Sequence, residues 1–137
     1  MEKLDFSPLD RAVAQLRDGL AEHATLPANK LMRDGVIQRF EFTYELSYKM
    51  LKRYLEATAS NPAAIDELSF QSLIRTGHEQ GLLQNSWDVW AAYRHARSIT
   101  SHVYDENKAL QVLAQVPAFL VEAEFLLARL LERNAAP

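Results

Sequence analysis

Residues 30–57 read KLMRDGVIQRFEFTYELSYKMLKRYLEA, and this stretch decides the fold that the sequence predicts. At a helical spacing of about 100° per residue, its apolar side chains fall on two stripes on nearly opposite sides. The first stripe consists of Ile37, Phe40, Tyr44, Tyr48, Leu51 and Leu55, and the second consists of Phe42, Leu46 and Met50. A helix with two apolar faces is stable only when both are covered.

The second stripe has two alternative partners. It can pack against a second copy of the chain, or both stripes can lie inside one monomeric bundle. Because the chain holds only a few short elements, it offers few partners for two stripes. The pattern therefore favours a homodimer.

The rest of the chain also has the pattern of helices. Only four glycines are present, and no Asn-Gly or Asp-Gly step lies between alternating strand patterns. Ser7 and Asp105 are candidate N-caps, and Pro117 predicts a kink or a break. We expect an all-α, up-and-down bundle of about five helices in a single domain over residues 1–137. The expected helices cover residues 7–23, 30–57, 69–79, 86–101 and 105–133.

Composition limits the function. The sequence contains no cysteine, which excludes disulfides and a catalytic thiol. A formal net charge of −3 argues against a broad nucleic-acid-binding surface but allows a small basic cleft. No apolar run approaches the roughly 18 residues that span a bilayer, and the N-terminus has no signal-peptide pattern. We therefore expect a cytoplasmic protein without membrane contact.

The stretch Arg97-Ser-Ile-Thr-Ser-His102-Val-Tyr104 carries the candidate chemistry. It combines a permanent cation, an imidazole that titrates near neutral pH and a phenol. An arginine can hold a phosphate while a histidine takes the proton from a 2′-hydroxyl, so the set suits RNA cleavage without a metal. Arg97 and His102 share a face only if the helix ends near residue 101. The alternative is a surface arginine beside a half-buried histidine, because the spacing alone also arises by chance.

The motif resembles the Arg-x4–6-His signature of the HEPN superfamily, in its Arg-x4-His-x-Tyr form. Residues 33–46, RDGVIQRFEFTYEL, resemble the second helix of the nucleotidyltransferase substrate-binding proteins, a HEPN subgroup. With the five-helix layout, the resemblance covers essentially the whole chain.

The resemblance implies a helical bundle that dimerises with its Arg-His motifs facing each other. It implies a metal-independent endoribonuclease toxin with Arg97 and His102 as catalytic residues and no cofactor. It also implies a minimal nucleotidyltransferase partner that attaches AMP to Tyr104. The subgroup's name implies another role, a non-catalytic subunit that binds nucleotide or substrate for that partner. A helical adaptor with a decayed site is a third reading.

Other polar residues have two readings each. Asp34, Gln38, Glu41 and Glu45 can line a nucleotide groove, with Glu41 the preferred candidate, or they can belong to a solvated face of the second helix. Arg94 can add positive potential near Arg97 or be an exposed helix charge. Trp87 and Trp90 can stack a base, but their spacing is more typical of core residues. His95 and His102 lack a third ligand for a metal site, so none is predicted.

Overall fold

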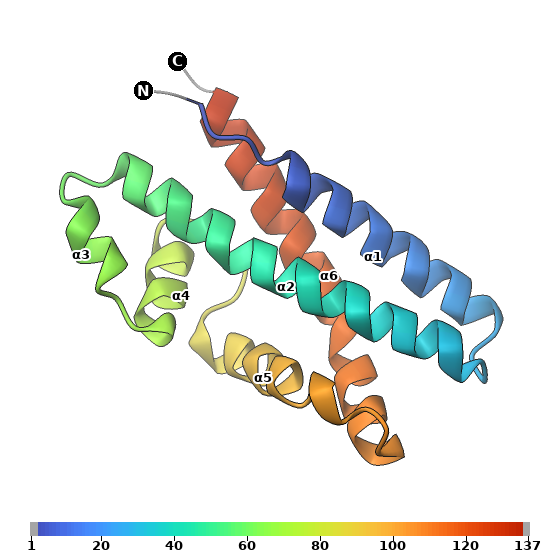
Figure 1. Ribbon diagram of the computed structural model, residues 1–137. Helices are drawn as coiled ribbons and strands as arrows, with labels where there is room; N and C mark the ends of the chain where they lie inside the picture. The colour runs from blue at the N-terminus through green and yellow to red at the C-terminus, as the bar shows by residue number, and fades with distance from the viewer. Residues whose placement is uncertain (1–2, 136–137) are drawn as a thin grey trace.

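The computed structural model describes residues 3–135 and is built from helices, with no strand in that range (Figure 1). The all-α prediction is confirmed. The element bounds are α1 (Ser7–Thr25), α2 (Lys30–Thr58), α3 (Pro62–Asp66), α4 (Phe70–Glu79), α5 (Trp87–Ser98), the 3₁₀ turn η1 (Thr100–His102) and α6 (Glu106–Ala135).

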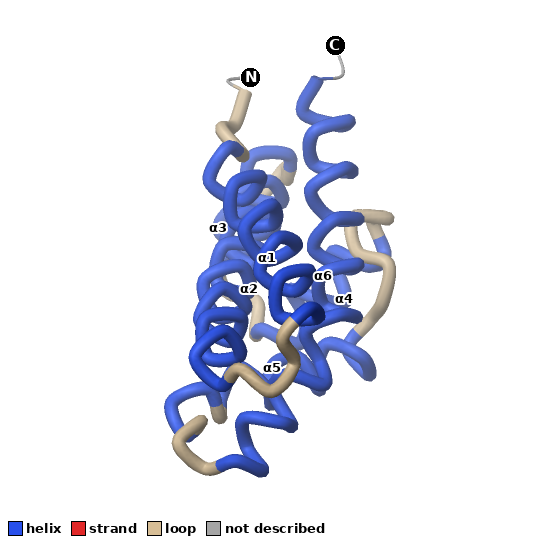
Figure 2. Tube along the Cα trace, turned by 90° about the vertical axis from the view of Figure 1, so that its right-hand side faces the viewer, coloured by secondary structure: helices blue, strands red, loops and turns tan. Residues whose placement is uncertain are grey.

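Three long helices form the frame of the bundle. α1 and α2 pack along each other, and α6 contacts both of them. The two described ends of the chain lie at the same pole in Figures 1 and 2. There the Leu4 amide donates to Asn134 Oδ1 at 3.2 Å, and Asn134 Nδ2 donates to the Leu4 carbonyl at 2.8 Å. α5 and η1 lie at the opposite side of the bundle, against α6 and α2.

Several local expectations were wrong. Residues 62–66 form a short helix that was not predicted, with a proline in its first turn. α6 continues through Pro117 without the break that was one of the two expectations there, because a missing N–H removes only one backbone bond and the proline is exposed. Ser7 is the first helical residue rather than the N-cap, and the Asp5 carboxylate accepts from its amide. Asp105 caps α6 as predicted, accepting from the amides of residues 107 and 108.

The two stripes of α2 are buried unequally. The first stripe enters the core, where Phe40 and Leu51 are fully buried, and only Tyr48 stays partly exposed. In the second stripe, Met50 is buried, but Phe42 and Leu46 remain partly exposed. A single copy of the chain therefore leaves part of the second stripe uncovered.

A third face of α2 was missed, because its residues are small and polar. Thr43 and Ser47 are fully buried, and each hydroxyl donates to the backbone carbonyl four residues earlier. Such bonds satisfy a buried hydroxyl without a partner on another helix. Small side chains at these positions allow α1 to lie close to α2, with Thr43 Oγ1 3.3 Å from the Ala12 carbonyl.

α6 is apolar enough, by length and composition alone, to cross a membrane. Its most apolar 18-residue window has a mean hydropathy of 1.5, and 44% of that window is buried inside the bundle. The buried stripe includes Val112, Val116, Phe119, Ala123 and Leu126. A helix at the centre of a bundle has the same composition, and α6 occupies that place here.

A buried carboxylate joins α6 to the segment that precedes α5. Glu122 is fully buried, and its oxygens accept from the amides of Gln84 and Asn85 at 2.8 and 2.9 Å. The indole Nε1 of Trp90, on α5, donates to the same carboxylate at 2.9 Å. Three donors take the place of the water molecules that the carboxylate loses on burial. This set of bonds fixes the start of α5 on α6.

We predict that Glu122→Gln lowers the free energy of unfolding by about 1–3 kcal/mol, because the amide nitrogen cannot accept one of these buried bonds. Urea denaturation followed by circular dichroism measures the change. Glu124→Gln is the matched control, since Glu124 pairs with Arg17 at the surface, and an exposed pair contributes about 0–1 kcal/mol. Equal stability of the two variants would contradict the role given to Glu122.

Candidate active site

Arg97 lies in the last turn of α5 and reaches across to α2. Its Nε donates to Glu45 Oε1 at 3.1 Å, and its Nη1 lies 3.5 Å from Glu41 Oε2. Nη1 also donates to Thr100 Oγ1 at 3.0 Å, and the side chain of Arg97 is 33% exposed. These bonds use Nε and Nη1, and no residue between 3 and 135 accepts from Nη2. Nε and Nη1 of the guanidinium are therefore held, and Nη2 is the nitrogen that remains open.

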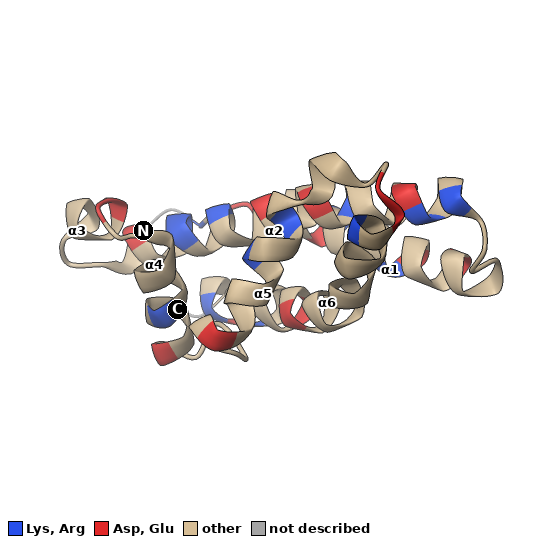
Figure 3. Ribbon diagram, turned by 90° about the horizontal axis from the view of Figure 1, so that it is seen from below, with Lys and Arg blue, Asp and Glu red and all other residues tan. Residues whose placement is uncertain are grey.

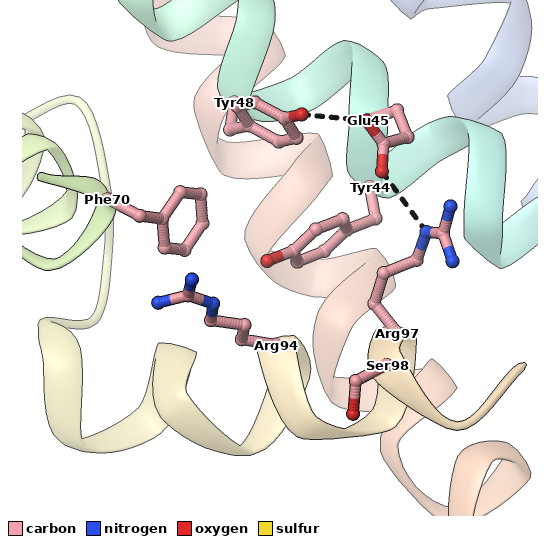
Figure 4. Close-up of a pocket in the computed structure, with 7 residues that line it drawn as sticks. All are labelled: Tyr44, Glu45, Tyr48, Phe70, Arg94, Arg97 and Ser98. Carbon is pink, nitrogen blue, oxygen red and sulfur yellow. Dashed lines mark hydrogen bonds and ion pairs between the residues drawn. The ribbon is translucent and has the colours of Figure 1, made fainter.

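Glu45 is itself held in place by a tyrosine one turn away. The Tyr48 hydroxyl donates to Glu45 Oε2 at 2.7 Å, so the two carboxylate oxygens bond to different partners (Figure 4). Partial burial raises the pKa of Tyr48, and the hydrogen bond to Glu45 adds to that rise. The phenol therefore remains a donor across the physiological pH range and fixes the carboxylate that orients Arg97.

The predicted residues on α2 do meet Arg97. Gln38 and Glu41 line a surface groove together with Glu45 and Arg97. The same groove contains the half-exposed apolar residues of the second stripe. We call it the α2 groove, and its lining residues are Gln38, Glu41, Phe42, Glu45, Leu46, Lys49 and Arg97. Acidic and basic segments are interspersed along α2 in Figure 3, as expected for a protein without a broad basic surface.

His102 and Tyr104 form a second cluster on the turn after α5. The predicted junction is present, because α5 ends at Ser98 and η1 covers the next residues. The Tyr104 hydroxyl lies 3.4 Å from His102 Nδ1, and Tyr104 is 85% exposed. Arg97 bonds to α2 and Thr100 rather than to either of them within residues 3–135. The motif therefore forms two neighbouring clusters rather than one.

Arg94 was predicted either to add positive potential near Arg97 or to be an exposed helix charge, and the two tryptophans were predicted either to stack a base or to lie in the core. The Arg94 guanidinium lies 5.1 Å from the centre of the Phe70 ring and 6.0 Å from that of Trp87. It is thus exposed but stacked. Trp90 is fully buried, as expected of a core residue, and Trp87 is only partly buried.

Sequence reasoning missed some residues that surround the site. Glu45 was only one of four possible groove residues and was not singled out, although it makes the shortest contact of Arg97 with α2. Thr100 lies inside the quoted motif, but its bond to Arg97 depends on the 3₁₀ turn. No group of three potential metal ligands occurs among residues 3–135.

An all-α bundle with an Arg-x4-His-x-Tyr turn, whose arginine pairs with two glutamates of α2, defines a protein of the HEPN class. A family model described as "nucleotidyltransferase substrate binding protein like" matches residues 4–132, and the chain belongs to that family.

Three known proteins are similar to this chain. A Haemophilus influenzae protein named "Probable ribonuclease HepT" is 47% identical over 100 residues, which are 73% of this chain and 68% of that protein. A solved H. influenzae structure, described as the substrate-binding domain of a nucleotidyltransferase, superposes with a TM-score of 0.86 at 36% identity. The match covers 92% of this chain and 98% of that one. A crystal structure from Thermus thermophilus has a TM-score of 0.70 at 31% identity, over 89% of this chain and 98% of that one.

Proposed function

We propose that this chain is a HEPN-type toxin, a metal-independent endoribonuclease that a cognate minimal nucleotidyltransferase inhibits by adenylylating Tyr104. The observation that carries the proposal is the open Nη2 of Arg97, one short turn before an exposed imidazole and phenol. The similarity to a protein named as a ribonuclease supports it. RNA and ATP are both available in the cytoplasm, where we place the protein.

The proposed reaction needs no group beyond those of the chain, the RNA and water. The 2′-oxygen bonds to the adjacent phosphorus, and the bond from phosphorus to the 5′-oxygen breaks. His102 takes the 2′-hydroxyl proton, and water protonates the leaving 5′-oxygen. Arg97 binds the phosphate through its open Nη2 and stabilises the charge that develops there. The products are a 2′,3′-cyclic phosphate and a 5′-hydroxyl.

The homodimer belongs to the same proposal. Phe42 and Leu46 stay partly exposed beside Arg97, in the α2 groove. A second copy that covered them would bring a second Arg97 and a second His102 towards the same cleft. Two such sites would place cationic groups on both sides of an RNA strand. This arrangement would also gather the two clusters of the motif around one phosphate.

A second candidate function is a non-catalytic subunit that binds nucleotide or substrate for a nucleotidyltransferase. The observation that favours it is the α2 groove, where polar residues and an arginine line one surface depression. The description of the family and of the similar H. influenzae structure supports the same role. In both functions the partner is a nucleotidyltransferase, and the two differ in whether this chain cuts RNA.

RNA cleavage by the purified chain separates these functions. We predict that Arg97→Ala and His102→Ala each lower the cleavage rate by about a hundredfold or more, because each removes a group that acts on the transition state. Cleavage of a labelled RNA should continue in EDTA. His95→Ala is the matched control, an exposed histidine on α5 that should leave the rate unchanged. Absence of any cleavage by the wild-type chain would favour the binding subunit.

Replacement of Leu46 tests the dimer. We predict that Leu46→Glu yields a monomer, because a carboxylate on a covered apolar face would lose its water. Sedimentation velocity measures the change. Leu31→Glu is the control, since Leu31 is 82% exposed near the start of the same helix. A wild-type chain that stays monomeric at high concentration would contradict the shared cleft.

Modification of Tyr104 can be followed by intact mass. With the cognate nucleotidyltransferase and ATP, the wild-type chain should gain AMP as the tyrosine oxygen bonds to the α-phosphorus and pyrophosphate leaves. The exposure of Tyr104 makes this phenol accessible. Tyr104→Phe should gain no mass, and modified wild type should lose RNA cleavage, because a bulky anion would lie beside His102. A full mass gain on Tyr104→Phe would place the acceptor elsewhere.

A further inference from the structure

A second pocket lies beside Arg97, between α2 and α5. Its lining residues are Tyr44, Glu45, Tyr48, Phe70, Arg94, Arg97 and Ser98, and we call it the α2–α5 pocket (Figure 4). It shares only Glu45 and Arg97 with the α2 groove. The two depressions therefore meet at the guanidinium of Arg97, and a ligand bound to that group can extend into either of them.

The pocket contains a hydroxyl without a protein partner, on a residue that is otherwise buried. Tyr44 is 4% exposed, and no residue between 3 and 135 bonds to its hydroxyl. Figure 4 shows this hydroxyl directed towards the space between Phe70 and Arg94. Burial raises the pKa of Tyr44 far above the ordinary value, so the group stays protonated. The hydroxyl faces the pocket and keeps contact with solvent there, so it is available to a ligand as both a donor and an acceptor.

Aromatic rings and guanidinium groups form most of the remaining wall of the α2–α5 pocket. The Phe70 ring meets the Tyr48 ring edge-to-face at 5.3 Å, and its centre lies 6.1 Å from that of the Tyr44 ring. The Arg94 guanidinium stacks on Phe70, and Arg97 closes the other side of the pocket. Aromatic faces and guanidinium planes are the surfaces on which nucleobases stack.

We propose that the α2–α5 pocket binds the base of the nucleotide whose phosphate Arg97 engages. The base stacks against Phe70 and Arg94, and its edge bonds to the Tyr44 hydroxyl. This inference deepens the proposed function and rests on it for the phosphate at Arg97. The same chemistry is offered by a nucleotide within RNA and by a free nucleotide.

Other ligands match the pocket less well. An aliphatic side chain would leave the Tyr44 hydroxyl unbonded. A small inorganic anion would make no use of the rings and would lie near the carboxylate of Glu45. A base satisfies the hydroxyl and the flat walls together, and it leaves the negative phosphate at the arginines.

Calorimetric titration of the full chain with AMP, UMP and ribose 5-phosphate tests the inference. Wild type should bind at least one of the two nucleotides about tenfold more tightly than ribose 5-phosphate, because stacking adds affinity only when a base is present. Tyr44→Phe should weaken binding of that nucleotide by about three- to tenfold and leave ribose 5-phosphate unchanged. The variant should fold normally, since it removes a hydroxyl that bonds to no other residue in the free protein.

Tyr54→Phe is the matched control, a buried tyrosine of the same helix that does not line the pocket. The inference is overturned if ribose 5-phosphate binds as tightly as both nucleotides, or if Tyr44→Phe behaves like Tyr54→Phe. A trinucleotide with 2′-O-methyl riboses, which cannot be cleaved, identifies the source. If the trinucleotide binds more tightly than AMP and UMP, and Tyr44→Phe removes that gain in affinity, the bound base belongs to RNA. If the trinucleotide shows no such gain, the bound base belongs to a free nucleotide.

Comparing the nucleotide titrations with the RNA-cleavage assay separates the inference from the proposed function. His102→Ala, which should lose cleavage, should keep base-dependent binding. Base-dependent binding without RNA cleavage by wild type would keep the pocket and reject the ribonuclease. Cleavage by wild type without base-dependent binding would reject the base-binding role of the pocket and keep the ribonuclease.

Discussion

The buried carboxylate of Glu122 is the interaction on which the geometry of the site depends. It joins the centre of α6 to two loop amides and to the indole of Trp90, and thereby fixes the first turn of α5. Arg94 and Arg97 lie one and two turns further along that helix. A small rotation of α5 would move the Arg97 guanidinium away from α2 and the Arg94 guanidinium away from Phe70 of α4. Because three donors satisfy one carboxylate in a dry interior, the helix has one favoured orientation. A polar contact in the core thus determines where two surface cations lie.

Electrostatic compensation dominates the surroundings of Arg97. Two glutamates of α2 contact the guanidinium, and the chain as a whole is acidic. A phosphate that approaches Arg97 therefore meets a cation whose charge is partly neutralised. Such a site discriminates against free anions and favours ligands that bring additional contacts. The neighbouring rings of Phe70 and Tyr48 offer contacts of this kind. The acidic surroundings hold the arginine in one orientation at the expense of its general attraction for anions.

Sequence reasoning predicted the helices well because long amphipathic segments carry a strong periodic signal. The first stripe of α2, the cap at Asp105 and the junction after α5 follow directly from such patterns. The short helix at 62–66 lacks enough residues for a periodic signal, and the continuity of α6 through Pro117 depends on tertiary packing. Of the candidate residues, Gln38 and Glu41 line the α2 groove and Arg94 lines the α2–α5 pocket, while Arg97 lines both and His102 and Tyr104 line neither. Tyr44 and Phe70 were not selected as site residues, and Glu45 was only one of four possible groove residues, because their roles depend on how α4 and α5 cross α2, which no local pattern encodes.

The reciprocal bonds between Leu4 and Asn134 have a consequence for assembly. They bring the two described ends of the chain, near residues 4 and 134, to one pole, while Tyr104 lies two residues before the start of α6 at the other pole. The 30 residues of α6 correspond to about 45 Å of helix. An enzyme fused to either end through a short linker would lie about the length of α6 away from the Tyr104 phenol. Affinity tags or fusion domains at the termini therefore leave the surroundings of Tyr104 unobstructed.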